Sequence, residues 1–501
     1  MRPLLFRTGL ATLATSVALL LMLFVRERPI VQVTGGLVRG VSSVEGTKLF
    51  RSIPFAQPPL DELRWKPPMS PLPWSGVRDV AGNAPPCLQA RFGWNDSLAD
   101  ESSEDCLYLQ VRTPRLDPSA KLPVMVWIHG GGNQAGAGRG YARSHIARRG
   151  VVLVMLQYRL GVFGFISHPE LTAESPDAAS GNYALQDQIA ALEWVRDNIA
   201  AFGGDPANVT VFGQSAGAQD VGLLLVSPLS KDLFSKAIAQ SGTATFGTMP
   251  RTLEENENIG KELARLAGAA GIAELRRKSG AEILRAAQSL AEPGAHDPSS
   301  LWLRAVIDGW VIRESPSATL ASSKQRRVPL ITGNNSRELP LRGGASQAQS
   351  AIEAAFGEKA PQAMKLYGLE PGAMVSDDQI MQIATDITFR CPALHMAEMY
   401  AAAGVPVWHY EFAMTSDANG VHHSSELPFV FYDTPINVPA QPAVSLQDYW
   451  TQFARSGDPN SAELPDWPTF DAQHRSLYVG TSGPRVVPDL RHEICSLLPR
   501  S

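Results

Sequence analysis

The 501-residue sequence has few charged residues, four cysteines and no internal repeat. Charged residues make up 19% of the chain and hydrophobic residues 44%, whereas ordinary soluble domains carry roughly 25% charged residues. The 42 glycines and 38 prolines stay below the roughly 25–30% share that marks low-complexity chains. These values exclude wholesale disorder and collagen-like repetition, so we expect many short elements around a large core.

The sequence also lacks an excess of positive charge. Its 44 basic and 49 acidic residues give a net charge of −5, whereas a protein that binds a polyanion usually carries a basic patch. Nucleic acid is therefore not expected as a partner. The four cysteines form no CxxC pair and no Cys/His spacing suited to zinc, so we expect no metal bound through sulfur.

The first 29 residues have the pattern of an export segment. Arg2 and Arg7 precede an uncharged stretch of 18 residues at 8–25, and two further arginines follow it. This pattern predicts a signal peptide or an N-terminal membrane anchor over residues 1–29, with a buried helix as the other interpretation. The stretch is just long enough to span a bilayer and no A-x-A cleavage site precedes Arg26, so signal peptide and anchor both stay open. In either case the chain is expected to be exported (secreted or periplasmic) or membrane-anchored, and its even cysteine count favours two disulfides.

The rest of the chain alternates between apolar runs and helical patterns. A hairpin is predicted over 30–41, around two glycines. Apolar residues three or four apart predict a helix over 185–202, ended at 203–206, and the composition of 251–290 predicts further helix. Unbroken apolar runs are typical of strands buried on both faces of a parallel sheet, and they cover 122–128, 151–156, 209–212, 328–332 and 405–412. The order predicts an α/β fold with a helical insertion.

The motif Gly-Gln-Ser-Ala-Gly at 213–217 lies between a predicted strand and an apolar stretch at 221–226. Such a motif alone is a weak signal, but a strand that turns sharply into a helix is what a nucleophile elbow requires. The two glycines allow close packing while Ser215 stays exposed in a strained conformation. The start of the helix also offers unpaired N–H groups to a developing anion.

The motif His-Gly-Gly-Gly at 129–132 directly follows the predicted strand at 122–128. Consecutive glycines let backbone N–H groups approach a substrate oxygen, as an oxyanion hole requires. A phosphate-binding loop is the rival interpretation. The segment lacks the Lys-Ser/Thr ending of a P-loop and the G-x-G-x-x-G spacing of a dinucleotide site.

With these motifs, the chain resembles the type B carboxylesterase/cholinesterase family of α/β hydrolases. The resemblance runs from about residue 30 to 495 and also rests on FRSIPFAQPP at 50–59, EDCLYL at 104–109, YRLG at 158–161, GNYALQDQ at 181–188 and FGGDP at 202–206. It implies a single α/β-hydrolase domain over 30–501, with a large, mostly parallel sheet flanked by helices. It also implies that Ser215 is the nucleophile and that the N–H groups of Gly131, Gly132 and Ala216 form the oxyanion hole.

In α/β hydrolases the acid and then the histidine follow the serine along the chain. Seven histidines follow Ser215, so order alone does not choose one. The segment 420–431 resembles the family's base segment, in which a histidine stands three residues before Glu and six before Phe, and this register selects His423. Its neighbour His422 is the alternative, otherwise a solvated loop residue, while His395 and His409 lie in apolar surroundings and are expected to be core residues.

For the acid, segment 331–338 resembles the family segment in which a strand ends in Gly and a Glu follows five residues later. This resemblance selects Glu338. The alternative is a surface carboxylate paired with Arg337 or Arg342. The family usually continues with Gly where this chain has Leu339 and Pro340, which puts the local loop geometry in question.

The family's disulfide order, carried over to this chain, implies the pairs Cys87–Cys106 and Cys391–Cys495. Four cysteines permit three pairings, so the sequence alone leaves the pairing open, and free thiols are the other interpretation.

The implied activity is serine carboxylesterase action on small-molecule esters through an acyl-enzyme, without metal or organic cofactor. Cholinesterases carry Glu before the nucleophile, where this chain has Gln214, and the first disulfide loop offers only Phe92 and Trp94 as aromatic residues. Trp94 is expected to pack that loop. We therefore expect a general carboxylester hydrolase whose pocket is partly built by the helical insertion and by Trp302 or Leu303.

Other functions compatible with this fold are an adhesion or binding protein that lacks the triad, a lipase and a carbamate hydrolase. The intact set of Ser215, Glu338 and His423 argues against the first of these. A lipase or a carbamate hydrolase would share the mechanism and differ in the pocket. The leader leaves membrane association possible, and the sequence does not predict an oligomeric state.

Overall fold

The computed structural model describes residues 28–141, 143–245, 250–290, 304–341, 343–369, 374–414, 420–434 and 445–499. Nearly all of the predicted leader lies outside these ranges, as do Trp302 and Leu303 of the predicted pocket. None of the helices within these ranges combines the length and the apolar character needed to cross a membrane.

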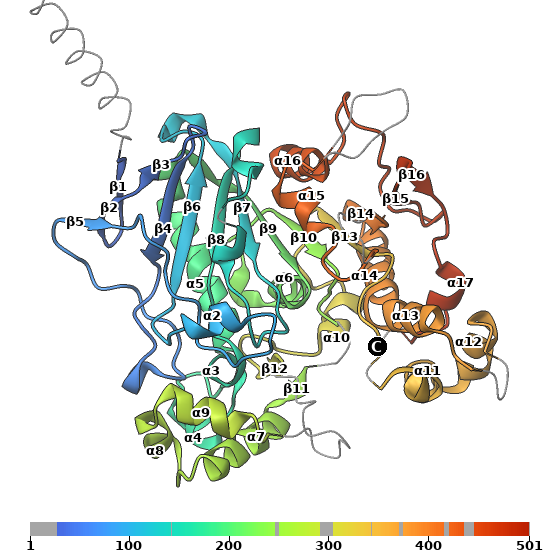
Figure 1. Ribbon diagram of the computed structural model, residues 1–501, viewed down its shortest axis with the longest axis horizontal. Helices are drawn as coiled ribbons and strands as arrows, with labels where there is room; N and C mark the ends of the chain where they lie inside the picture. Colours follow the sequence, from blue (N-terminus) through green and yellow to red (C-terminus); the bar gives the residue numbers. More distant parts are fainter. Residues whose placement is uncertain are drawn as a thin grey trace, which may run out of the picture.

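An eleven-stranded sheet runs through the molecule (Figure 1). Seven neighbouring strands, from β15 to β8, pair in parallel, and antiparallel strands close both edges. The predicted α/β architecture is thus confirmed. In spatial order the strands are β16 (Gly483–Val487), β15 (Ser476–Gly480), β14 (Val407–Phe412), β13 (Leu330–Asn335), β10 (Lys236–Gln240), β9 (Gly204–Gln214), β7 (Leu122–Ile128), β8 (Val152–Leu156), β6 (Tyr108–Thr113), β4 (Lys48–Pro54) and β3 (Val41–Ser42).

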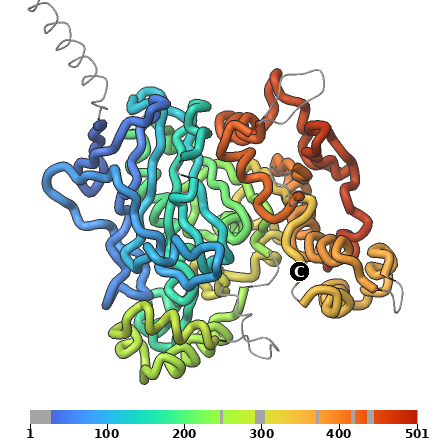
Figure 2. Tube along the Cα trace, viewed as in Figure 1, coloured from blue at the N-terminus to red at the C-terminus, as the bar shows by residue number. Residues whose placement is uncertain are grey.

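The predicted N-terminal hairpin forms outside this sheet. Strands β1 (Ile30–Val33) and β2 (Gly36–Arg39) pair antiparallel, and β5 (Val77–Asp79) adds to β2. The trace in Figure 2 then passes from this N-terminal end through the central strands to the C-terminal segments at the opposite end.

The predicted helix over 185–202 corresponds to α5 (Tyr183–Asn198), followed by a 3-10 turn at Ile199–Phe202. Gly203 ends that turn in a left-handed conformation, with a φ of 82°. The next strand, β9, begins at Gly204 and not at residue 209 as the apolar run predicted. The reason is that Gly204 already pairs with Leu122 of β7, after which the register shifts until Val209 pairs with Val124.

Residues 251–290 form the predicted helical insertion, with β11 (Arg251–Thr252), α7 (Leu253–Leu266), α8 (Ile272–Arg277) and α9 (Gly280–Ala287). Thr252 and Ser279 begin α7 and α9 with capping boxes, in which a hydroxyl and a glutamate three residues later satisfy free backbone N–H groups. The insertion lies at one end of the molecule, below the sheet in Figure 1.

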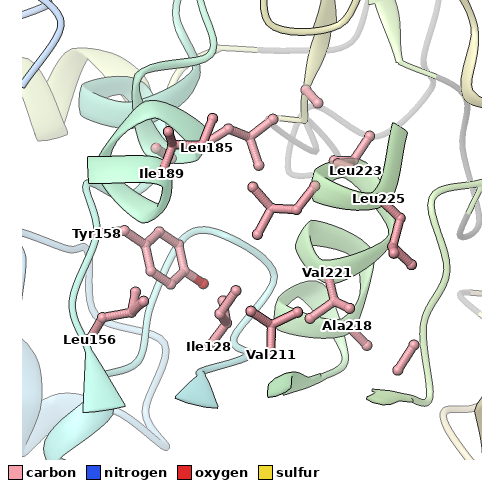
Figure 3. Packing of buried hydrophobic residues seen from close by; sticks show 14 of the residues in the cluster. Ile128, Leu156, Tyr158, Leu185, Ile189, Val211, Ala218, Val221, Leu223 and Leu225 are labelled. Atoms are coloured by element: carbon pink, nitrogen blue, oxygen red, sulfur yellow. The ribbon is translucent and has the colours of Figure 1, made fainter. Parts of the chain in front are cut away.

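Alternation along the strands separates two apolar clusters, one on each face of the sheet. Along β7, Val124, Val126 and Ile128 join one cluster, and Met125 and Trp127 join the other. Figure 3 shows how side chains of α5 and of α6 (Ala216–Val226) meet in the first cluster, over the ends of the central strands. The second cluster is covered by α15 (Leu427–Phe431) and α16 (Leu446–Ser456).

The remaining elements complete the layers around the sheet. They are α2 (Asp96–Asp100), α3 (Gly161–Phe165), α4 (Pro169–Glu174), β12 (Val306–Ile307), α10 (Pro316–Ala321), α11 (Ala348–Phe356), α12 (Ala360–Leu366), α13 (Asp377–Thr385), α14 (Cys391–Ala402) and α17 (His492–Cys495).

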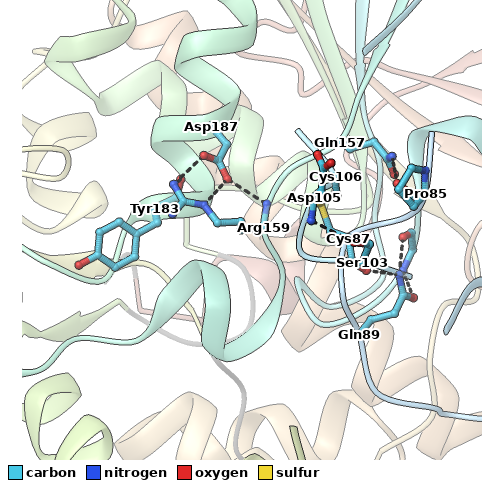
Figure 4. Close-up of a disulfide and its surroundings, with 11 residues drawn as sticks. Pro85, Cys87, Gln89, Ser103, Asp105, Cys106, Gln157, Arg159, Tyr183 and Asp187 are labelled. Carbon is cyan, nitrogen blue, oxygen red and sulfur yellow. Dashed lines mark hydrogen bonds and ion pairs between the residues drawn. A yellow bond between two sulfur atoms is a disulfide. The ribbon is translucent and has the colours of Figure 1, made fainter. Parts of the chain in front are cut away.

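Both disulfides that the resemblance implies are present. Cys87 pairs with Cys106 and closes a loop of 19 residues, as Figure 4 shows with its neighbours. Cys391 pairs with Cys495 across 104 residues and ties α17 to the start of α14. The second bridge restricts the unfolded chain more because its loop is longer.

Candidate active site

Ser215 lies at the corner between β9 and α6. Its backbone has φ 58° and ψ −128°, a conformation that costs energy for any residue other than glycine and that is typical of functional sites. The neighbouring glycines are required by contact: a Cβ on Gly213 would lie 2.4 Å from the carbonyl oxygen of Gly217, and one on Gly217 would lie 2.2 Å from that of Ile128. The corner therefore has the geometry of a nucleophile elbow.

The loop after β7 packs against this corner. A Cβ on Gly130 would lie 3.0 Å from the Cβ of Ser215, and Gly131 and Gly132 have positive φ angles of 112° and 65°. Within the described chain, no hydrogen bond uses the N–H groups of Gly131, Gly132 or Ala216. These three donors are therefore available to an oxygen that binds beside Ser215.

Glu338 follows β13 and is 1% exposed. Its Oε1 accepts hydrogen bonds from the Ser241 hydroxyl at 2.6 Å and from the backbone N–H of Asn335 at 2.7 Å. Its Oε2 lies 2.6 Å from Nδ1 of His423. The alternative of a surface carboxylate is wrong, since Glu338 is buried and Arg337 pairs with Asp378.

His423 lies between β14 and α15, and its backbone N–H donates to the carbonyl oxygen of Glu338. Its Nε2 lies 3.2 Å from the side-chain nitrogen of Gln214. The neighbouring His422 turns its Nδ1 to the carbonyl oxygen of His423. The structure thus brings His423, and not His422, against the acid, and the ring of Phe389 packs beside the imidazole.

The other two predicted core histidines are indeed buried. His409 is fully buried and bonds to the Ser476 hydroxyl, and His395 Nε2 lies 2.9 Å from the carbonyl oxygen of Cys495. Both therefore serve the core, and neither lines the Ser215 cavity.

Ser215 and His423 both line a cavity of about 640 Å³. Its other walls are the glycine loop and mostly apolar side chains, and among the described residues no Asp, Glu, Lys or Arg lines it. His129 also lines it, and burial lowers the pKa of this histidine to about 4, so it is neutral. The apolar wall is made by Phe92, Trp94, Leu98, Ala137, Tyr141, Leu339 and Leu427.

One expectation about this wall is wrong. Trp94 was expected to pack the first disulfide loop, but it is 65% exposed and lines the cavity. Its ring lies close to the oxyanion loop, since a Cβ on Gly131 would be 3.4 Å from the Trp94 ring. The nearby Leu339, in the segment that departs from the family pattern, lines the same cavity.

Two buried carboxyl groups near the site were not found from the sequence. Glu426 is fully buried and accepts hydrogen bonds from the side-chain amides of Asn335 and Gln240. Burial, and then the charge of Glu338, raise the pKa of Glu426. Glu338 thus faces the histidine, whereas Glu426 lies behind it among side-chain amides. The signal in the sequence was the Glu three residues after His423.

The second carboxyl group is Asp220, on α6. It accepts hydrogen bonds from the side chain of Asn133 at 3.1 Å and from that of Gln188 at 2.6 Å, and burial raises its pKa to about 7. Asn133 directly follows the glycine loop and has a φ of 56°. The Tyr158 hydroxyl donates to the carbonyl oxygen of His129 at the other end of the loop. Asp220 and Tyr158 thus hold the two ends of the glycine loop.

One group of side chains in the described ranges has the composition of a metal site, Glu398, His474 and His492. It lies outside the Ser215 cavity. The two imidazoles stack, with ring centroids 3.8 Å apart and planes 18° apart. Parallel rings cannot direct both lone pairs at one ion, so this group is not a preformed metal site.

Known proteins resemble this chain over almost its whole length. The model of the carboxylesterase family matches residues 27–497. Fumonisin B1 esterase of Sphingopyxis macrogoltabida is 34% identical over 88% of this chain and 85% of its own, and liver carboxylesterase 1 of Oryctolagus cuniculus is 32% identical over 91% and 90%. Among solved structures, a carboxylesterase of Geobacillus stearothermophilus superimposes with a TM-score of 0.80 at 30% identity, covering 94% of this chain and all of its own. A PNB esterase gives a TM-score of 0.79 at 30% identity, over 95% of this chain and all of its own.

Proposed function

This chain belongs to the carboxylesterase family and is a serine carboxylesterase of α/β-hydrolase fold, and we propose that Ser215, His423 and Glu338 carry out its ester hydrolysis. The observation that supports this assignment is the 2.6 Å contact between Glu338 and Nδ1 of His423 beside a strained serine on the same cavity. The presence of all three residues also argues against the alternative of a catalytically inactive adhesion or binding protein, because such a protein needs none of them.

In the proposed reaction, Nε2 of His423 takes the Ser215 proton while Oγ attacks the ester carbonyl carbon. The carbonyl oxygen becomes an oxyanion, stabilised by the N–H groups of Gly131, Gly132 and Ala216. The imidazolium returns its proton to the leaving alcohol, which leaves an acyl group on Ser215. Water then attacks the acyl-enzyme by the same steps and releases the acid, while Glu338 orients the imidazole and stabilises its positive charge.

The assignment is tested with an organophosphonate and with p-nitrophenyl esters. We expect the organophosphonate to label Ser215, found by peptide mass spectrometry, and Ser215→Ala to abolish hydrolysis. His423→Ala should also be inactive, whereas His422→Ala, the matched control, should keep activity within a few fold. Full activity in Ser215→Ala would overturn the assignment.

We further propose uncharged, largely apolar esters as the substrates. The cavity wall is apolar and, within the described residues, its lining includes no acidic or basic side chain, so a charged acyl or alcohol group would lose water without gaining a partner. A panel of esters matched in size but differing in charge tests this. We expect kcat/KM for neutral esters to exceed that for carboxylated and quaternary ammonium esters by tenfold or more. The same panel, extended to triglycerides and carbamates, distinguishes the lipase and carbamate hydrolase alternatives.

We also propose that the chain is exported, with residues 1–29 as signal peptide or anchor and residues 30–501 as one domain. Two disulfides are compatible with an oxidising compartment. Cell fractionation followed by mass measurement of the N-terminus tests this. A soluble exported protein that lacks the leader supports a signal peptide, a membrane-bound one that keeps it supports an anchor, and an intact cytoplasmic protein refutes export.

A further inference from the structure

Gln214 is the last residue of β9 and is 3% exposed. Its side chain lines the Ser215 cavity, and its Nε2 lies 3.2 Å from Nε2 of His423. This is the imidazole nitrogen that has to accept the serine proton in the proposed reaction. The residue before the nucleophile thus contacts the atom on which general-base catalysis depends.

The protonation of the imidazole follows from its other contact. Nδ1 of His423 lies 2.6 Å from the Glu338 carboxylate, so this nitrogen carries the hydrogen. Nε2 then holds a lone pair, and the amide of Gln214 donates a hydrogen bond to it. Within the described chain, no hydrogen bond joins His423 to the Ser215 hydroxyl.

From this contact we infer that Gln214 is a positioning residue for the general base. In the free enzyme the Gln214 amide holds Nε2 of His423 unprotonated by occupying its lone pair, until substrate brings the Ser215 hydroxyl into the place of the amide. The inference rests on the proposed roles of Ser215 and His423. Two donors compete for one lone pair, so the amide has to release Nε2 before the proton is transferred. A hydrogen-bond donor at a lone pair competes with a proton for the same position.

Among the described residues, few other titratable groups surround His423. Glu338 faces Nδ1, Glu426 lies behind it directly before α15, and the Tyr410 hydroxyl lies near both carboxyls. His422 is adjacent in the chain and bonds to a backbone oxygen. Across the cavity His129 is neutral. None of these groups is hydrogen-bonded to the Gln214 side chain, which contacts His423, and a control variant separates this contact from the effect of charge in the cavity.

The test compares the pH dependence of kcat/KM, with a p-nitrophenyl ester, in Gln214→Met and Gln214→Glu. Methionine has a similar length but no donor, and glutamate replaces the donor with a negative charge that stabilises an imidazolium. We expect the acid limb of the profile to move to higher pH in the order wild type, Met, Glu, by at least one pH unit for Glu. Above the limb, kcat/KM should recover to within about tenfold of wild type.

Gln134→Glu is the matched control, because it adds the same charge to the same cavity without the contact to His423. Its acid limb should move less than half as far as that of Gln214→Glu. Titration with an organophosphonate gives the fraction of folded active sites in each variant, so a misfolded variant is recognised and corrected for. Unshifted acid limbs in both Gln214 variants, or equal shifts in Gln214→Glu and Gln134→Glu, would overturn the inference. If Ser215→Ala is inactive at the same time, the proposed function stands without it.

Discussion

Asp220→Asn should make the protein more stable at neutral pH and change how its stability depends on pH. Asp220 is fully buried, and its only hydrogen-bond partners in the described chain are the amides of Asn133 and Gln188. No cation of the described residues offsets its charge, and burial raises its pKa to about 7. In the unfolded chain an aspartate titrates near pH 4.

The size of the effect follows from these two values. Between about pH 4 and 7 the folded protein keeps a proton that the unfolded chain has lost, so stability falls as the pH rises. The loss is about 1.4 kcal/mol per pH unit, or about 4 kcal/mol once the pH exceeds 7. The amide of the variant does not ionise and avoids this loss. Its shape is tolerated because Oε1 of Gln188, which has no partner in the described chain, can accept from the new amide after the Gln188 side chain rotates.

Thermal unfolding at pH 5 and at pH 8 measures this difference. About 3 kcal/mol of the loss in stability falls between pH 5 and pH 8. For a chain of this length, each kcal/mol of stability changes the Tm by about 1–2 °C. The Tm of Asp220→Asn relative to wild type should therefore rise by about 3–6 °C from pH 5 to pH 8. The exposed Asp177→Asn serves as control and should show no such trend. If the Tm difference between Asp220→Asn and wild type is the same at both pH values, Asp220 does not titrate in this range and the reasoning fails.

Three further predictions concern the site and the disulfides. Glu338→Gln should lower kcat on p-nitrophenyl esters by about 10³-fold or more with little change in KM, because the amide no longer stabilises the imidazolium; a loss under tenfold would contradict this role. Gly217→Ala should lower the Tm and the yield of folded protein, because the new Cβ would lie 2.2 Å from the carbonyl oxygen of Ile128. The control Gly82→Ala places its Cβ in open space, so its Tm and yield should match those of wild type. Replacing Cys391 and Cys495 by Ser should lower the free energy of unfolding, measured in urea, by about 4–5 kcal/mol. Replacing Cys87 and Cys106 should lower it by about 3 kcal/mol, because that disulfide closes a shorter loop. Equal losses would refute the loop-length argument.

The sequence predicted the parts of the site that depend on local pattern and chain order. A strand followed by Gly-x-Ser-x-Gly specifies an elbow, because each glycine meets backbone within 2.5 Å. The resemblance to the family supplied the register for Glu338 and His423. The start of β9 was missed because residues 204–208 are not apolar, and their pairing depends on a register shift in β7.

The polar support of the site could not be predicted in the same way. Asp220 meets Asn133, which lies 87 positions earlier in the chain, and Gln188, which lies 32 positions earlier. Ser241 reaches Glu338 across 97 positions. A single buried carboxylate leaves no periodic pattern in the sequence. Its hydrogen-bond partners become known only when the order of the strands in the sheet is known. Trp94 was misjudged for a related reason, because a loop aromatic packs inward or lines a cavity according to what lies opposite it.

The position of the site explains which parts of the chain can vary. The glycine loop follows β7, Ser215 follows β9, Glu338 follows β13 and His423 follows β14, and these strands are parallel members of one sheet. Their carboxyl ends therefore lie at one edge, where side chains separated by over 200 positions come together. The side chains proposed to react follow the carboxyl ends of these strands, whereas the cavity wall comes from connections such as the first disulfide loop and the segment at Leu339. Changes in those connections can alter which ester fits without moving the reacting atoms, so differences in substrate between this chain and its relatives should map to the wall.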